Sequence, residues 1–360
     1  MKGYLLKNYG LSKNNLAPSK FTLKLRSALS NPMYHFLIFG ILMIVVGYLS
    51  INKVLPYSWS SGLASTFAYS IASVGFCLLM GYSGLASLGT GGFIAIGTYS
   101  IYYVMGKAGL PFIMALVICI AIAIAIGAIV GFISLRIEGI YLCILTLGLS
   151  EILRNLFVAI QDTIINSKFY LFGAAVPRSY GIYIVTAALV IVMIITQNII
   201  NSPTGRAMLA MKNSTSAAQA MGVSLMKYRL LAFIICTVYA SLTGIMLMII
   251  VRSAQASNSA GFYALITSLN ILAAVIIGGY RSVWGAVFGT FIMYGLQTVL
   301  LSRVQFFVDN PVIITFISGI LVILVVMFYP GGAAQLVSEV KGKIKKLIRK
   351  VSERIYGKDV

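Results

Sequence analysis

The 360-residue sequence has few charged residues, only seven of them acidic, whereas 60% of its residues are apolar. A soluble domain of this length needs more polar surface, so the composition excludes a soluble protein and indicates an integral membrane protein. The sequence has one histidine, His35, and four cysteines, Cys77, Cys119, Cys143 and Cys236, which lie in apolar runs without metal-ligand spacing. We therefore expect neither a metal site nor a disulfide framework, and we interpret the cysteines as small packing residues.

The familiar catalytic and nucleotide-binding patterns are also missing. The sequence contains no phosphate-binding GxxxxGK[ST] loop, no HExxH motif, no Cys/His cluster and no GxSxG nucleophile elbow. A chain without a phosphate loop does not bind ATP in that manner. Without an acid–base or metal constellation, we expect neither enzymatic activity nor a cofactor.

The formal net charge of +20 is concentrated near the two ends of the chain. Six lysines and arginines fall within the first 30 residues, and eight more lie between Lys341 and Lys358. Basic segments beside membrane spans follow the positive-inside rule and attract anionic lipid headgroups. We therefore expect both termini to lie in the cytoplasm next to membrane lipid, and we expect no nucleic-acid partner.

Hydropathy predicts about ten apolar segments with lengths suited to membrane helices. The third and eighth are short or interrupted by glycine, so eight spans plus two re-entrant hairpins fit the pattern nearly as well. With the basic N-terminus inside, the loops after even-numbered segments are cytoplasmic. The segments are Tyr34–Leu49, Leu63–Met80, Ala86–Met105, Leu110–Leu135, Ile140–Ile160, Gly181–Ile199, Leu230–Val251, Phe262–Ile277, Trp284–Leu301 and Val312–Tyr329.

This pattern divides the chain into three regions. Residues 1–33 form a basic cytoplasmic tail, and residues 34–330 form a membrane domain that contains a cytoplasmic loop at 201–229. Residues 331–360 are basic and carry apolar residues at intervals of three or four, as in Leu336, Val340 and Ile344. Such spacing predicts an amphipathic helix that lies on the inner membrane surface.

Two glycine-rich stretches indicate an internal repeat. Gly81–Ser100 reads GYSGLASLGTGGFIAIGTYS and Gly278–Gly295 reads GGYRSVWGAVFGTFIMYG. Both have Gly-Tyr followed by a small polar residue and spaced glycines, and many transporters contain internal repeats. Glycines also let helices pack closely, so a packing role explains the same residues.

The one acidic residue clearly inside a predicted span is Glu151, and Arg154 follows it by three residues. This spacing places both side chains on the same helix face. A charge near the middle of a membrane helix costs about 2.5–3.5 kcal/mol on insertion scales, which favours a local ion pair. We interpret Glu151 and Arg154 as a structural pair rather than as a proton relay.

A polar segment, Asn201–Arg229, interrupts two long apolar runs and reads NSPTGRAMLAMKNSTSAAQAMGVSLMKYR. Its alanines, methionines and leucines favour helix, and Ser202-Pro203 has the pattern of a helix start. The charged residues of this segment are all basic. We interpret this cytoplasmic, helical loop as a surface to which another protein binds.

Within this loop, Ala217 and Ala218 are followed, after three intervening residues, by Gly222, which resembles the coupling loop of ABC importer permeases. The acidic residue that usually precedes the two alanines is replaced by Ser216. Longer pieces of the chain resemble the branched-chain amino acid ABC importer permease family, in order and spacing from about Gly81 to Pro330. They are GYSGLASLGTGGFIAIG, LRIEGIYLCILTLGLSEILR, TGRAMLAMKNSTSAAQAMGVSLMKYRLLAF and GGYRSVWGAVFG. The EGIY…TL…SEILR stretch favours the subunit that pairs with a second, different permease.

The resemblance implies a permease in the bacterial cytoplasmic membrane that imports a small polar solute, most of all branched-chain amino acids. It implies as partners two ABC ATPase subunits, a second homologous permease and an extracytoplasmic solute-binding protein. Urea, short amides, simple sugars and nucleosides remain alternative solutes, and a secondary transporter or channel is the alternative class. The residues expected to couple to the ATPase are Arg206, Lys212, Ala217, Ala218 and Gly222.

The solute path is expected near the glycine-rich break that follows Gly81. A broken helix exposes backbone groups and helix ends that suit a zwitterion. The same small residues are equally explained by helix packing. The candidate path residues are Ser83, Ser87, Thr90 and Thr98.

Overall fold

The computed structural model describes residues 32–52, 56–135, 139–165, 170–171, 174–175, 177–257 and 261–300, with isolated positions between 313 and 332. Six of its helices are long and apolar enough to cross a membrane, so the chain is an all-helical, multi-pass membrane protein. Two antiparallel strand pairs, β1–β4 and β2–β3, lie in the connections. In chain order the elements are α3 (Pro32–Ile51), α4 (Tyr57–Leu78), the π-helix η2 (Leu79–Ser83), α5 (Thr90–Ile101), the π-helix η3 (Tyr102–Lys107), α6 (Phe112–Ser134), α7 (Ile140–Gln161), β1 (Thr163–Ile165), β2 (Tyr170–Leu171), β3 (Ala174–Ala175), the 3-10 turn η4 (Arg178–Tyr180), α8 (Gly181–Asn201), α9 (Pro203–Asn213), α10 (Thr215–Ala220), α11 (Leu225–Val251), β4 (Ser253–Gln255), α12 (Leu265–Gly278), α13 (Val283–Thr290) and the π-helix η5 (Phe291–Leu300).

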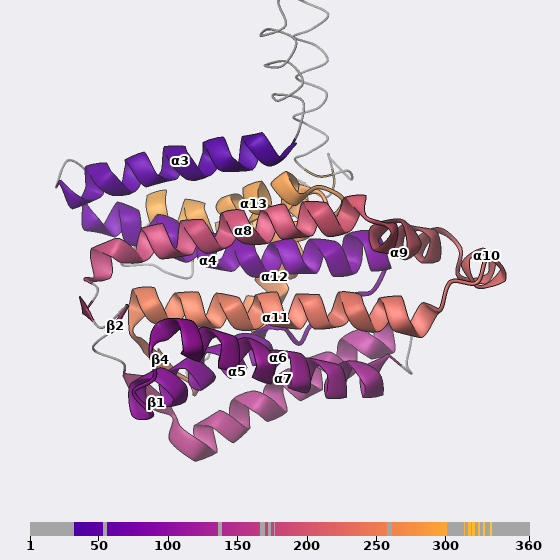
Figure 1. Ribbon diagram of the computed structural model, residues 1–360, viewed down its shortest axis with the longest axis horizontal. Helices are drawn as coiled ribbons and strands as arrows, with labels where there is room; N and C mark the ends of the chain where they lie inside the picture. The colour runs from indigo at the N-terminus through magenta and orange to yellow at the C-terminus, as the bar shows by residue number, and fades with distance from the viewer. Residues whose placement is uncertain are drawn as a thin grey trace, which may run out of the picture.

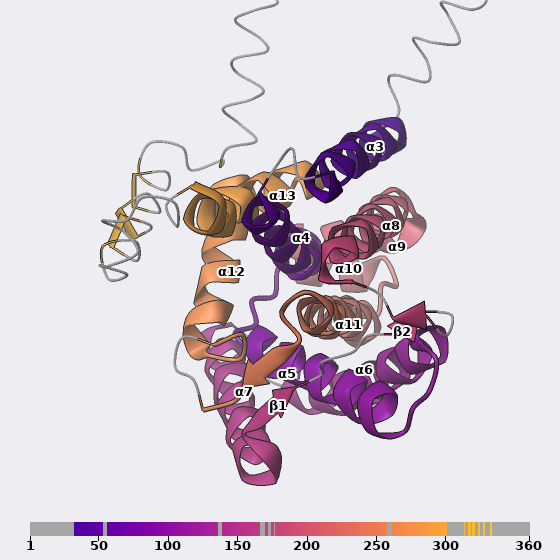
Figure 2. The ribbon, with the colours of Figure 1, turned by 90° about the vertical axis from the view of Figure 1, so that its left-hand side faces the viewer.

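Helices α4, α5 and α11 form the centre of the bundle, as the end-on view in Figure 2 shows for α11. Small residues let these helices approach closely. A Cβ added at Gly97 of α5 would overlap the backbone oxygen of Ser241 in α11. Between α11 and α4, Thr243 Oγ1 donates a hydrogen bond of 2.9 Å to the carbonyl of Ala68. The outer helices α3, α6 and α7 expose most of their apolar side chains, as expected where helices face lipid or another membrane subunit.

Connections gather at two ends of the bundle (Figure 1). One end holds α9 and α10, and there Lys212 Nζ of α9 contacts the backbone of Met80 and Gly81, where α4 and η2 end. The opposite end holds the β1–β4 pair, in which Thr163 is opposite Gln255. This pair joins the end of α7 to the end of α11, so the two helices finish on the same side.

Nine of the ten predicted apolar segments coincide with observed helices, although their bounds differ by a few residues. The third segment begins within a non-helical stretch at 84–89 and becomes helical only at Thr90, so the predicted interruption is present. The eighth corresponds to α12, whose 14 residues are fewer than the ~20 of a full span. Most of the tenth segment, the basic tail at 1–31 and nearly all of the C-terminal helix at 331–360 lie outside the described residues. The number of spans therefore stays a prediction.

Candidate functional site

The polar segment at 201–229 folds as two short helices followed by the first turn of α11. Ser202 ends α8 and begins α9, because its Oγ donates to the carbonyl of Ile199 at 2.6 Å and accepts from the amide of Gly205 at 3.4 Å. Pro203 follows as the first helical residue, where a missing backbone N–H costs nothing. The predicted helix start is confirmed.

Helix α10 is closed at both ends by local hydrogen bonds. Ser214 Oγ accepts from the amide of Ala217 at 3.2 Å, which caps the first turn. At the other end, Gly222 has φ of 80°, and the amide of Val223 donates to the carbonyl of Ala218 at 3.0 Å. This is a Schellman ending, which requires a left-handed residue and therefore favours glycine. Gly222 defines the shape of the loop by its backbone, since a Cβ there would meet no other atom within 4 Å.

Helix α10 projects from the end of the bundle, farther than any other labelled helix (Figure 1). Ala217 and Gly222 are exposed, and Met221 is 86% exposed, which is unusual for a large apolar side chain. Ala218 differs from its neighbour because it is buried. An exposed apolar residue on a short, well-capped helix is suited to a partner's cleft.

Two of the predicted coupling cations point in different directions. Arg206 is exposed, and its Nη1 donates to the carbonyl of Asn201 at 3.2 Å. Lys212 instead turns toward the bundle, where its Nζ donates to the carbonyls of Met80 at 3.1 Å and Gly81 at 2.8 Å. Lys212 therefore contacts the membrane domain rather than the outer surface of the loop.

Lys212 also lies over the ring of Tyr280, 4.4 Å from the ring centroid. Burial, reinforced by the positive charge of Arg281, lowers the pKa of Lys212 below its ordinary value. Its hydrogen bonds go to carbonyl groups at a helix end, which carry partial negative charge and favour a cation. One side chain thus joins α9 to the end of α4 and to the turn between α12 and α13.

The two glycine-rich stretches meet at this point. A Cβ added at Gly81 would overlap the backbone oxygen of Tyr280, so only glycine fits without a shift of backbone. The hydroxyl of Tyr82 donates to the carbonyl of Arg281 at 3.1 Å, and the thiol of Cys77 donates to the carbonyl of Tyr280 at 3.2 Å. Each stretch contributes its Gly-Tyr turn, so the turns that look similar in sequence lie against each other.

Helix α5 begins inside the bundle, and hydroxyl groups from other helices satisfy its first amides. The amide of Gly92 donates to Ser150 Oγ of α7 at 2.7 Å, and that of Gly91 donates to Ser268 Oγ of α12 at 2.8 Å. Just before the helix, the amide of Leu88 donates to Thr146 Oγ1 at 3.0 Å. Sequence reasoning missed these three hydroxyl residues, and their only signal was a polar side chain inside an apolar segment. They make the break in the third segment stable at membrane depth.

The four candidate path residues are buried around this helix start. Ser87 Oγ accepts from the amide of Gly89 at 3.4 Å, and Thr98 Oγ1 donates to the carbonyl of Ile94 at 2.9 Å. Ser83 Oγ is buried without a hydrogen-bond partner among the described residues. Thr90 is the first residue of α5. These residues do not line any of the three cavities described next, so their role in a path stays a prediction.

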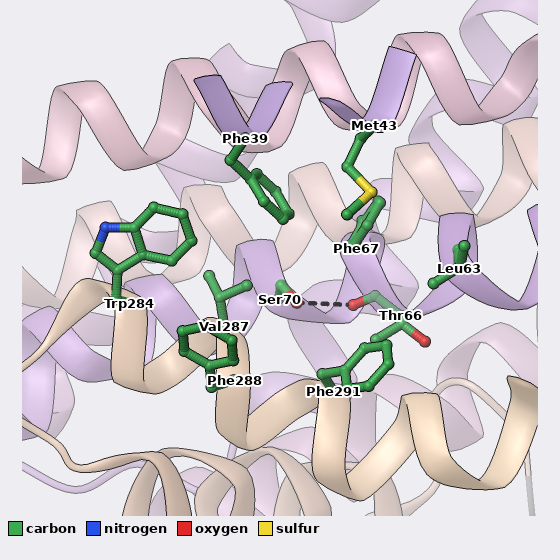
Figure 3. Close-up of a pocket in the computed structure, with 10 residues that line it drawn as sticks. All are labelled: Phe39, Met43, Leu63, Thr66, Phe67, Ser70, Trp284, Val287, Phe288 and Phe291. Carbon is green, nitrogen blue, oxygen red and sulfur yellow. Dashed lines mark hydrogen bonds between the residues drawn. The ribbon is translucent and has the colours of Figure 1, made fainter. Parts of the chain in front are cut away.

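Three cavities lie between helices, and apolar side chains dominate all of them. The cavity in Figure 3, of about 190 Å³, lies between α3, α4 and α13 and is lined by aromatic residues such as Phe67 and Trp284. Its hydroxyl residues hydrogen-bond within α4, as Ser70 does to the carbonyl of Thr66 at 2.9 Å. A second cavity of about 460 Å³ lies between α6, α8 and α11, and a third of about 370 Å³ lies between α6 and α7. Such surfaces suit hydrocarbon rather than a polar solute.

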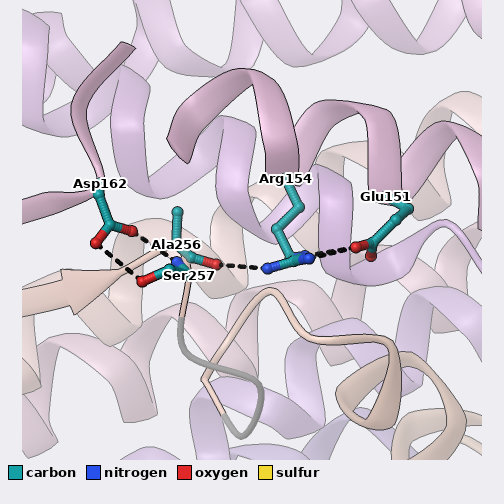
Figure 4. Close-up of polar contacts among 5 residues, drawn as sticks. All are labelled: Glu151, Arg154, Asp162, Ala256 and Ser257. Carbon is teal, nitrogen blue, oxygen red and sulfur yellow. Dashed lines mark hydrogen bonds and ion pairs between the residues drawn. The ribbon is translucent and has the colours of Figure 1, made fainter. Parts of the chain in front are cut away.

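The charged pair predicted in the fifth segment is in contact on α7 (Figure 4). Arg154 Nε donates to Glu151 Oε1 at 2.9 Å, and Arg154 Nη2 forms an ion pair with the same oxygen. Arg154 Nη1 also donates to the carbonyl of Ala256 at 3.2 Å. Asp162 fixes this neighbouring loop, because its carboxylate accepts from the amide of Ser257 at 2.7 Å and from the hydroxyl of Ser257 at 2.9 Å. Hydrogen bonds from Ser257 lower the pKa of Asp162 below its ordinary value.

Comparison with known proteins adds to this geometry. The family described as branched-chain amino acid transport system / permease component matches residues 58–326. The high-affinity branched-chain amino acid transport system permease protein LivM of Escherichia coli is 28% identical over 288 residues, which cover 70% of this chain and 66% of that protein. The LivM protein of Salmonella typhimurium is 30% identical over 250 residues, covering 60% of this chain and 57% of that protein. The chain thus spans less than two thirds of the length of each relative. No solved structure matches.

Proposed function

The chain belongs to the branched-chain amino acid transport permease family, and on this premise we propose that it is a permease subunit of an ATP-driven importer of branched-chain amino acids. The observation that carries the proposal is the projecting loop of α9 and α10, with Ala217 and Met221 exposed beyond the bundle. A chain that lacks a phosphate-binding loop needs ATPase subunits, and this loop offers them a rigid contact.

Charge supports a cytoplasmic position for the end that holds this loop. Among the described residues, that end carries basic residues and no acidic ones, whereas the β1–β4 end carries Asp162 beside its basic residues. The positive-inside rule favours the more basic end in the cytoplasm. Both termini then fall on the cytoplasmic side, as the even number of predicted segments requires. The basic residues of the loop end are Arg206, Lys212, Lys227, Arg229 and Arg281.

The contacts of Lys212 suggest how force passes from the loop into the membrane domain. In the proposed mechanism, ATPase subunits grip α10 and displace α9 with it, since the Ser214 cap joins the two helices without a flexible linker. Lys212 transmits the displacement to the ends of α4 and η2 and to the turn at Tyr280. The loops next to α5 then move together, which opens or closes the solute path.

The proposed assembly contains two ATPase subunits, a second homologous permease and an extracytoplasmic solute-binding protein. The match to a family of transport-system permease components supports an assembly of several subunits. The binding protein would select the solute and deliver it to the β1–β4 end, opposite the ATPases. Branched-chain amino acids are the proposed solute because both relatives carry that description.

The test is uptake by the full chain, affinity-tagged, purified from its own membranes with its partners and reconstituted in vesicles. We expect ATP-dependent uptake of labelled leucine. Ala217→Trp should abolish it, because the indole would prevent α10 from entering the cleft of the ATPase subunit. Ala108→Trp is the matched control, since Ala108 is an exposed alanine at the opposite end of the bundle. Both variants should insert into the membrane normally. Uptake that needs no ATP, with no ATPase co-purifying, would instead establish a secondary transporter or channel.

A further inference from the structure

Helix α7 exposes mainly apolar side chains, as the other outer helices do, but polar residues lie among them. Gly148, Glu151 and Asn155 follow one another at spacings of three and four residues, which places them on one side of the helix. We call this the open α7 face. The side chain of Glu151 is 41% exposed, and Asn155 is also exposed. A Cβ added at Gly148 would meet no atom within 4 Å.

Glu151 lies at the middle of its span. The apolar helix extends over Tyr141–Gln161, so ten residues separate Glu151 from each end. At 1.5 Å per residue this places Glu151 about 15 Å from either end, near the centre of a ~30 Å hydrocarbon layer. Ionisable residues at this depth face a protein interior or a water-filled cavity, because hydrocarbon does not solvate them. An exposed carboxylate here therefore indicates that lipid does not cover the open α7 face.

The three cavities described above are lined chiefly by apolar side chains, and Gly148 itself lines the third, between α6 and α7. None of the three suits a polar solute better than the side of α7 that carries Glu151 and Asn155. Figures 1 and 2 place α7 at the outer edge of the bundle, and Glu151 and Asn155 on it are accessible to a neighbour. A route along α7 would thus lie between this chain and another membrane subunit.

The charged groups on α7 are arranged so that each has capacity for a further contact. Both hydrogen bonds from Arg154 to Glu151 use Oε1, and no donor contacts the other oxygen within the part of the chain that the structure describes. Arg154 is fixed from two sides, by Glu151 and by the carbonyl of Ala256. A neutral pair with a fixed cation and an accessible anion is complementary to a zwitterion, which carries an ammonium and a carboxylate on neighbouring atoms.

We propose that the open α7 face lines a water-filled solute passage between this chain and the second permease, and that Glu151 there contacts the ammonium group of a zwitterionic solute. The proposal rests on the proposed function, because it takes the second permease as the neighbour that covers α7. In this proposal Arg154 orients Glu151 and contacts the carboxylate of the solute.

The first experiment measures whether water reaches the open α7 face in the assembled transporter. The four native cysteines are replaced by alanine, and single cysteines are introduced as Glu151→Cys or Asn155→Cys. The control is Ile124→Cys, which lies near the middle of α6 on its exposed, apolar side. The probe is a charged, membrane-impermeant methanethiosulfonate applied to the reconstituted complex.

We expect both α7 thiols to react at least about tenfold faster than the control thiol, because a thiol ionises to its reactive form only where water solvates it. Substrate together with the binding protein should slow the reaction. Rates equal to that of the control would overturn the proposal, whether lipid or a dry interface covers α7. This readout needs no transport, so loss of uptake in the parent protein would count against the proposed function alone.

The second experiment separates a solute contact from a structural pair. Glu151→Gln keeps the shape and one hydrogen-bonding oxygen but removes the charge, and uptake is counted per assembled complex. We expect turnover to fall about tenfold or more, with the amount of assembled complex unchanged. Unchanged turnover per complex would overturn the contact, and a loss confined to the amount of complex would assign the pair to stability only.

Discussion

The two ends of the bundle are each held by a charged side chain that bonds to backbone groups, but the arrangements differ. At the loop end, Lys212 donates to the carbonyls of Met80 and Gly81. At the opposite end, Asp162 accepts from the amide of Ser257, and a strand pair and the hydroxyl of Tyr99 support the same connection. The far end is thus held mainly by a strand pair and a carboxylate, whereas at the loop end Lys212, Tyr82 and Cys77 all bond to the backbone of two short turns.

This difference indicates which end of the bundle can transmit motion. A connection with many parallel hydrogen bonds resists the loss of any one of them. A connection in which side chains bond to the backbone of two short turns transmits a displacement of one turn to the other. The loop end, where we propose that ATPases act, has the second kind of connection.

The largest expected effect comes from Gly81→Ala. The added methyl group would overlap the backbone oxygen of Tyr280, and neither backbone can move away without disturbing the turn. Overpacking of this kind costs about 1–3 kcal/mol, so the thermal midpoint of the purified protein should fall clearly. Gly148→Ala is the control, since the site is open and alanine favours helix. Equal midpoints for the two variants would show that the Gly-Tyr turns are not in firm contact.

A smaller effect is expected from Lys212→Met, which keeps most of the length of the side chain but removes the ammonium group. Hydrogen bonds that involve a charged group contribute about 1.5–3 kcal/mol, and half-burial places Lys212 at the lower limit. Uptake should fall more than stability does, because α9 loses its link to α4 while ATP hydrolysis continues. Lys227→Met is the control, since Lys227 is exposed on the first turn of α11. Coupled uptake in the Lys212 variant would remove the proposed transmission route.

The smallest effect concerns Asp162 and appears as a dependence on pH. Its pKa is lowered in the folded protein, so its contribution to stability is complete above the ordinary carboxyl pKa and is lost as the pH falls through the folded value. The thermal midpoint should therefore drop below about pH 4, and less so in Asp162→Asn. If the thermal midpoints of the parent protein and of Asp162→Asn change with pH in the same way, the strands hold this end without the carboxylate.

The sequence allowed good predictions wherever a contact is local. Apolar runs predicted the helices, Ser202-Pro203 predicted the start of α9, and the glycines after Gly81 predicted the break before α5. The spacing of Glu151 and Arg154 predicted that the two side chains could meet. In each case the pattern covers only a few residues, so backbone geometry alone relates the sequence to the structure.

The contacts that sequence could not supply join segments far apart in the chain. Lys212 has the sequence context of a surface cation, yet its partners are more than 130 residues away. The hydroxyls of Ser150 and Ser268 reach the start of α5 only because three helices pack together. The strands β1 and β4 have three residues each, which is too short for a strand pattern to be recognised.

Helix α11 has a mechanical consequence because of its length. It extends without interruption or proline from Leu225 to Val251, 27 residues that measure about 40 Å along the axis. That exceeds the thickness of the hydrocarbon layer, so its first turns stand in the cytoplasm if the loop end lies there. An uninterrupted helix of this kind tilts as one unit rather than bending. A change in its angle at the α10 junction would therefore displace β4 sideways on the other side of the membrane.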